Sequence, residues 1–129
     1  MARERRELHV LVVDDNSMLR LLLVEVLAQA GCRVSTACDG VEAVNILEEE
    51  PVDCLITDYD MPRMNGLELI RWSKANLPHM TVVMMSGRNC QALAAEGREC
   101  GALRILRKPI SVEHLLSLVG EFRKTTAPP

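Results

Sequence analysis

The sequence predicts an α/β fold in which five parallel strands form one sheet with helices on both faces. Short apolar runs alternate five times with longer segments whose apolar residues recur at helical spacing. The chain has 129 residues, the usual size of one domain, and its composition of 48% hydrophobic and 26% charged residues is globular. Because right-handed crossovers place helices on both sides of a parallel sheet, five such units give a doubly wound (βα)5 three-layer sandwich.

The five expected strands are short runs that contain apolar residues, and the first of them, residues 8–13, is typical of a buried strand. They cover residues 8–13, 32–37, 52–57, 80–85 and 103–106. Polar residues follow four of them: Asp14 and Asp15 come after the first, Asp58 after the third, Ser86 after the fourth, and Lys108 two residues after the fifth. The residues able to carry chemistry therefore cluster at strand ends.

The five expected helices carry apolar residues on one face and have capping residues at their ends. They cover residues 18–30, 41–49, 67–75, 91–96 and 111–122. Asn16 or Ser17 can cap the first helix and Gly31 ends it, while Ser111 begins the last. The fourth helix is rich in alanine and poor in large apolar residues, so we expect it to be short or mobile.

We expect one domain over residues 8–124, a charged N-terminal tail at 1–7, and a C-terminal tail or linker at 125–129. No apolar run reaches the ~20 residues that a membrane helix requires, and the N-terminus lacks the pattern of a signal peptide. The 5 cysteines are odd in number and have no paired spacing, which predicts reduced thiols and a cytoplasmic location. A net charge of −3 argues against direct binding of nucleic acid.

The strand-end residues are expected to share one edge of the sheet. Ligands of open α/β sheets bind beyond the carboxyl ends of the strands, where the strand order reverses. In the flavodoxin-like order 2-1-3-4-5 the first and third strands are neighbours, which brings Asp14, Asp15 and Asp58 into one pocket, with Ser86 and Lys108 on its far side. Clustered carboxylates repel one another unless a cation relieves the repulsion, so we expect Mg²⁺, or Mn²⁺ in its place.

Such a pocket suits the transfer of a phosphoryl group to a carboxylate. Asp58 is the best candidate for the nucleophile because it stands alone at the end of a central strand. Asp14 and Asp15 then serve the metal, and Lys108 neutralises charge on the transferring group. Ser86 can donate a hydrogen bond to a phosphoryl oxygen.

Four segments in combination resemble the response-regulator receiver domains of two-component signalling, the CheY-like superfamily. They are VVDDN at 12–16, DYDMPRMNG at 58–66, MSG at 85–87 and LRKP at 106–109. The resemblance runs from about residue 8 to residue 123, and the order and spacing of the four segments all agree.

The resemblance implies specific roles for the strand-end residues. It implies that Asp58 is the phosphoacceptor and that Asp15 is the main metal carboxylate, with Asp14 in support. The backbone carbonyl of Asp60 is implied as a further metal ligand, together with Asp58. Ser86 is implied as the switch hydroxyl, Lys108 as the partner of the phosphoryl group, and the Lys108–Pro109 bond as cis.

The resemblance also implies partners. A histidine kinase or histidine phosphotransferase donates the group, and the surface of helix four, strand five and helix five then changes its preference for a downstream protein that the sequence does not identify. The domain catalyses only its own phosphorylation and dephosphorylation and is not otherwise an enzyme. Membrane binding is not expected, and a phosphorylation-dependent homodimer is consistent with the resemblance.

One position departs from the family pattern. Receiver domains often carry Tyr or Phe three residues before the lysine of strand five, and this chain has Ile105 there. Isoleucine has no ring to rotate behind the switch hydroxyl of Ser86. The chemistry of phosphorylation is unaffected by this substitution, but the form of the conformational response is open.

Two other functions compete with this interpretation. The first is a receiver-like interaction module that does not use phosphate, which only Ile105 favours. The second is a phosphatase of the haloacid-dehalogenase type, because Asp58 and Asp60 form a D-x-D pair; in those enzymes, however, the pair follows the first strand. A single stoichiometric phosphorylation favours the receiver, whereas multiple turnover of a phosphoester favours the phosphatase.

Overall fold

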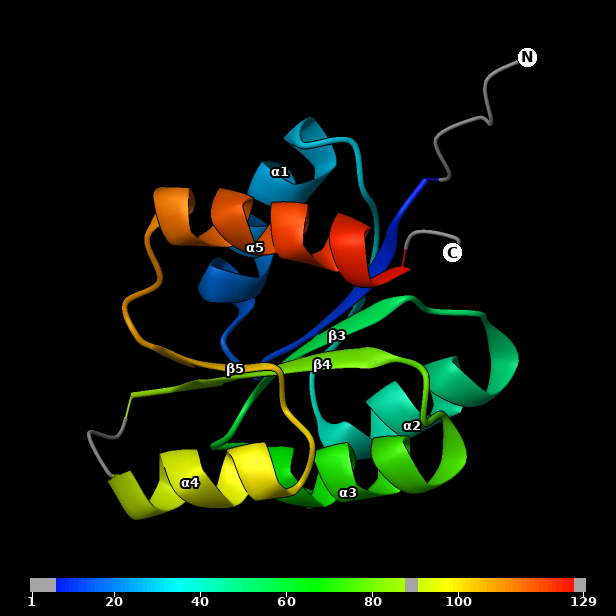
Figure 1. Cartoon of the computed structure of the whole chain (residues 1–129), viewed down its shortest axis with the longest axis vertical. Coiled ribbons are helices and arrows are strands. Elements are labelled where there is room, and N and C mark those ends of the chain that lie inside the picture. Colours follow the sequence, from blue (N-terminus) through cyan, green and yellow to red (C-terminus); the bar gives the residue numbers. More distant parts are fainter. Residues whose placement is uncertain (1–6, 88–90, 127–129) are drawn as a thin grey trace.

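The protein is a three-layer sandwich built on one parallel sheet (Figure 1). The computed structural model describes residues 7–87 and 91–126. The sheet has the order β2-β1-β3-β4-β5, and each neighbouring pair is parallel. The predicted fold class and strand order are therefore confirmed. Most of the expected N-terminal tail, and residues 127–129 of the C-terminal one, lie outside the described residues.

Every expected element is present, and the observed ends differ from the expected ends by at most four residues. The strands are β1 His9–Val13, β2 Arg33–Ala37, β3 Cys54–Asp58, β4 Thr81–Ser86 and β5 Arg104–Arg107. The helices are α1 Ser17–Gln29, α2 Gly40–Glu49, α3 Gly66–Asn76, α4 Gln91–Glu99 and α5 Val112–Thr126. None of these helices is long and apolar enough to cross a bilayer.

Two helix ends correct the sequence-based expectation. The helix α4 continues to Glu99, three residues beyond the expected end and past Gly97, because Gly97 packs closely against Ile105 and this tertiary contact overrides the low helix propensity of glycine. The helix α5 extends through Thr126, so Thr125 belongs to the helix and not to a tail. The Thr125 hydroxyl lies 3.1 Å from the hydroxyl of Thr81 at the start of β4.

The apolar core lies in two layers, one on each face of the sheet. Helices α1 and α5 cover one face, and α2, α3 and α4 cover the other (Figure 1). Because side chains alternate along a strand, Val10 and Val12 of β1 join the first layer, whereas Leu11 and Val13 join the second. Strands β1 and β3 are buried along their full length, so the residues at their carboxyl ends are held by a rigid scaffold.

Candidate functional site

Three carboxylates meet at the carboxyl edge of the sheet. In the pairing of β1 with β3, Val13 lies opposite Thr57, so Asp14 and Asp58 follow at the same level. One carboxylate oxygen from each of Asp14, Asp15 and Asp58 lies within 4.8 Å of the other two. Asp14 and Asp58 are buried and Asp15 is exposed. The predicted gathering of these three side chains is confirmed.

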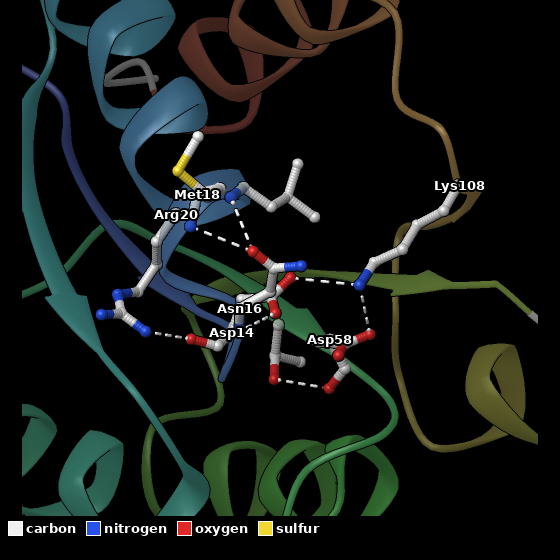
Figure 2. Close-up of polar contacts among 8 residues, drawn as sticks. Asp14, Asn16, Met18, Arg20, Asp58 and Lys108 are labelled. Carbon is white, nitrogen blue, oxygen red and sulfur yellow. Dashed lines mark hydrogen bonds and ion pairs between the residues drawn. The ribbon is translucent and has the colours of Figure 1, made fainter.

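The ammonium group of Lys108 bridges two of these carboxylates (Figure 2). Its Nζ lies 3.0 Å from Asp58 Oδ1 and 3.1 Å from Asp14 Oδ2. Lys108 follows β5, its backbone N–H donates to the carbonyl of Ser86 at 2.8 Å, and its bond to Pro109 is cis, as the resemblance implied. The lysine thus reaches the carboxylates from a loop fixed to the end of β4.

Burial and the contact between Lys108 and Asp58 are the largest influences on the pKa values of these two groups. Burial raises the pKa of Asp58 and the nearby Asp14 and Asp15 add to this, while the hydrogen bond from Lys108 opposes it without reversing the direction. For Lys108, burial lowers the pKa, but its contacts with Asp58 and Asp14 outweigh burial, and the net shift is upward. One ammonium does not balance three carboxylates, so the pocket retains an excess of negative charge.

This donor set fits a hard divalent cation. Mg²⁺ and Mn²⁺ prefer oxygen ligands, and Mg²⁺ is typically held by one or two carboxylates with waters completing the shell. Two buried carboxylates beside an exposed one leave such an ion open to solvent on the side of Asp15. Binding of the ion would also relieve the repulsion from Asp14 and Asp15, which adds to the effect of burial on the pKa of Asp58.

Two residues hold Asp14 in position: Asn16, which caps α1, and Arg20 within α1 (Figure 2). The backbone N–H of Asn16 donates to Asp14 Oδ1 at 2.8 Å, and the Asn16 side chain caps α1 by accepting from two backbone N–H groups. The guanidinium of Arg20 donates to the carbonyl oxygen of Asp14 at 2.6 Å. The sequence analysis gave no role to Arg20. The feature of the sequence that could have indicated one is its position one helical turn after the capping residue Asn16.

The loop between β3 and α3 returns closely against the backbone of Asp58. A Cβ atom at Gly66 would lie 2.5 Å from the carbonyl oxygen of Asp58, so only glycine fits there. The Gly66 N–H donates to the Tyr59 carbonyl at 2.9 Å, and the Tyr59 N–H donates to the backbone carbonyl of Met85 at 2.9 Å. These contacts fix both ends of the loop that carries Asp60, an exposed residue.

Ser86 and Ile105 occupy neighbouring strands but different environments. Ser86 is the buried last residue of β4, adjacent to the backbone of Lys108. Ile105 in β5 is half-buried and packs under α4, where a Cβ atom at Gly97 would lie 2.7 Å from Ile105 Cδ1. Ile105 therefore fills the space beneath α4.

A family model described as the response regulator receiver domain matches residues 10–120. The chain belongs to this family. Its curated relatives include the response regulator MprA of Mycobacterium avium, 31% identical over 121 residues, and the DNA-binding transcriptional regulator NtrC of Azospirillum brasilense, 32% identical over 120 residues. The match covers 94% and 93% of this chain but only 53% and 25% of those relatives, so the chain spans about half of one and a quarter of the other.

Solved receiver structures have the same fold. The chemotaxis response regulator CheY4 of Vibrio cholerae is 29% identical with a TM-score of 0.84, and the match covers 91% of this chain and 99% of that one. A response regulator receiver domain protein of Clostridium thermocellum is also 29% identical, with a TM-score of 0.85 and coverage of 91% and 94%. The chain is thus a receiver domain of a two-component response regulator, with a cluster of aspartates at the carboxyl edge of its sheet.

Proposed function

We propose that this receiver domain accepts a phosphoryl group on Asp58 from the phosphohistidine of a histidine kinase or histidine phosphotransferase. The observation that carries the proposal is the contact of Lys108 Nζ with both Asp58 and Asp14, inside a cluster of three carboxylates. A carboxylate attacks phosphorus only when ionised, and the ammonium keeps the buried Asp58 closer to that state. Bound Mg²⁺ or Mn²⁺ supplies charge neutralisation for the phosphoryl oxygens.

In the proposed reaction, an oxygen of Asp58 forms a bond to phosphorus as the bond from phosphorus to the donor imidazole nitrogen breaks. The donor imidazole carries a proton on its other ring nitrogen and therefore leaves as a neutral ring, and the product is an acyl phosphate. Asp14 and Asp15, with the carbonyl oxygen of Asp60, are the groups proposed to hold the metal. Lys108 pairs with the new phosphoryl oxygens, and the Ser86 hydroxyl donates to one of them. The domain acts only on itself and is not an enzyme for other substrates.

The surface formed by α4, β5 and α5 is proposed to report the change. The helix α4 is weakly anchored, because its buried residues are Leu93 and Gly97, and glycine contributes no side chain. Elements with few buried apolar contacts move at low cost in free energy. Movement of Ser86 towards the phosphoryl group would shift Ile105 and the helix above it, biasing an existing equilibrium towards a state that binds a downstream protein or a second copy of the chain.

We limit the expectation of no nucleic-acid partner to the receiver domain itself. Its net charge of −3 does not favour a phosphate backbone, but one of its relatives is a DNA-binding regulator of which it spans a quarter. A kinase donor and the reduced thiols of Cys32, Cys38 and Cys100 support a cytoplasmic location.

Incubation with acetyl phosphate and Mg²⁺, followed by intact mass measurement, tests the proposal. We expect a gain of one phosphoryl group that is absent with a chelator and absent in Asp58→Asn. No gain in the parent chain would favour the phosphate-independent module. Multiple turnover of a phosphoester would favour the phosphatase, although here the D-x-D pair begins at the end of β3 and not after the first strand.

A further inference from the structure

The loop between β3 and α3 is tied to the loop between β2 and α2 by an ion pair outside the carboxylate cluster. Arg63 Nη2 donates to Asp39 Oδ2 at 2.5 Å. The Asp39 side chain is only 8% exposed, whereas that of Arg63 is 62% exposed. The arginine therefore leans over a buried carboxylate that belongs to a different loop.

The carboxylate of Asp39 is itself held in place. Its Oδ1 accepts from the backbone N–H of Glu42 at 2.9 Å and caps α2. This hydrogen bond and the contact with Arg63 lower the pKa of Asp39, so it is ionised at neutral pH. Asp39 is thus the buried, hydrogen-bonded member of the pair, and Arg63 is the exposed member.

The backbone at Arg63 adopts a conformation that is unfavourable for arginine. Arg63 has φ of 69°, and the Met64 N–H donates to the Pro62 carbonyl at 2.7 Å, closing a three-residue turn. Turns of this kind with a positive central φ are the rarer and more strained form, and glycine or asparagine would adopt the conformation at lower cost. An ion pair whose arginine is exposed contributes only modestly to stability, so the contact with Asp39 compensates for part of this conformational cost.

A second contact joins the same two loops. A Cβ atom at Gly40 would lie 2.7 Å from the Cβ of Met64, so the residue after Arg63 rests directly on the first residue of α2. Together with Gly66 at the other end, these contacts determine the path of residues 59–65, which include Asp60.

We propose that Arg63 is a positioning residue for metal loading: through its ion pair with Asp39 it holds the β3–α3 loop so that the backbone carbonyl of Asp60 faces the carboxylate cluster. The inference rests on the proposed function, in which that carbonyl is a metal ligand. Without the ion pair the loop samples other paths, and the metal must bear the cost of ordering it.

Simple charge effects and positioning predict opposite results for the removal of Arg63. Deleting a cation near a Mg²⁺ site reduces repulsion and should lower the Kd for Mg²⁺. Loss of positioning should raise it instead. Arg63→Asn is the decisive variant because asparagine tolerates the left-handed backbone but carries no charge; Arg63→Gly is the second variant if the first folds poorly.

The experiment is a Mg²⁺ titration of the unphosphorylated chain, followed by the amide NMR signals of residues 14, 15 and 58–60. We expect Arg63→Asn to raise the Kd for Mg²⁺ about three- to tenfold, and Arg63→Lys to raise it less. Asp39→Asn keeps a side-chain oxygen that can cap α2, and it should raise the Kd for Mg²⁺ as much as Arg63→Asn does. The double variant should be no worse than either single variant. The control is Arg71→Gln, which also removes one positive charge from an exposed ion pair, that of Arg71 Nη2 with Glu96 Oε2 at 2.9 Å, between α3 and α4. This variant should not raise the Kd for Mg²⁺.

Phosphorylation by acetyl phosphate provides a second readout. The Mg²⁺ concentration at half-maximal rate should rise in Arg63→Asn, while the rate at saturating Mg²⁺ stays within about twofold of the parent, because positioning affects loading and not the reacting groups. If the parent binds Mg²⁺ and Arg63→Asn has an unchanged or lower Kd, the positioning role is overturned and the proposed function stands. A parent that binds no Mg²⁺ overturns both.

Discussion

Replacement of Lys108 by methionine removes the ammonium from the cluster and keeps most of the side-chain volume. Its Nζ contacts Asp58 at 3.0 Å and Asp14 at 3.1 Å, and both carboxylates are buried. Removing one partner of a buried ion pair costs about 3–5 kcal/mol because the remaining charge is uncompensated. The Lys108 side chain is 24% exposed, so solvent screens part of this energy, and we expect a loss of about 2–4 kcal/mol in the free energy of unfolding at neutral pH without metal.

Magnesium should reduce this loss, because a divalent ion among the carboxylates replaces the missing positive charge. We expect at least about 1.4 kcal/mol of the loss to be recovered at saturating Mg²⁺, which by linkage means that the variant binds Mg²⁺ about tenfold more tightly than the parent. Phosphorylation by acetyl phosphate should nevertheless be slower, because Lys108 no longer neutralises the transferring group. Tighter metal binding combined with slower phosphorylation is the specific signature of a lysine that competes with the metal for the same carboxylates.

Urea unfolding at zero and saturating Mg²⁺, followed by the fluorescence of the single tryptophan, Trp72, measures both quantities. The control is Lys74→Met, since the Lys74 ammonium is partly buried but donates to the backbone carbonyl of Met80 at 2.8 Å and has no contact with the cluster. Its effect on stability should be the same at both metal concentrations. An equal loss for Lys108→Met with and without Mg²⁺ would refute the electrostatic reasoning.

Three further predictions follow from the packing and charge of the site. The pKa of Asp58 is raised in the folded protein, so the folded protein binds a proton at Asp58 more tightly than the unfolded chain does. Without metal, the free energy of unfolding should therefore rise as the pH falls from the folded-state pKa of Asp58 towards the ordinary carboxyl value. Urea titrations across this pH range should show a flatter slope for Asp58→Asn. Gly66→Ala should cost about 1–3 kcal/mol in urea unfolding, since its Cβ would meet the backbone of Asp58 at 2.5 Å; a neutral result would contradict the close approach. Gly97→Ala should cost about 1 kcal/mol by pressing on Ile105, and adding Ile105→Val should restore part of the loss, whereas strict additivity of the two changes would count against their contact.

The fold was predictable because the local patterns agree with one another. Strands β1 and β3 are rich in apolar residues, and both are buried along their full length. The ends of elements were less predictable. Asp58 was expected after its strand but is the last residue of β3, because the ladder with β4 continues to pair it with Met85. The length of α4 was underestimated because its last turn includes Gly97, whose close packing against Ile105 cannot be read from local helix propensity.

The carboxylates and the lysine were predictable for a topological reason. The carboxyl ends of parallel strands share one edge, so residues that follow those strands meet whatever the details of packing. Contacts made by loops have no such rule behind them. The hydrogen bond from Arg20 to the Asp14 carbonyl depends on the conformation of a long side chain that reaches back along α1. The ion pair of Arg63 with Asp39 forms at a residue with positive φ, and arginine, unlike glycine or asparagine, does not indicate a positive φ in a sequence.

Chemical mapping of the phosphorylated residue tests the central claim most directly. The chain is incubated with acetyl phosphate and Mg²⁺, reduced with borohydride, which converts an aspartyl phosphate to homoserine, and digested for peptide sequencing by mass spectrometry. The account predicts homoserine at position 58, formed with Mg²⁺ and not with a chelator. Homoserine at position 14, 15 or 60 instead, or no modification of a folded, Mg²⁺-loaded chain, would contradict it.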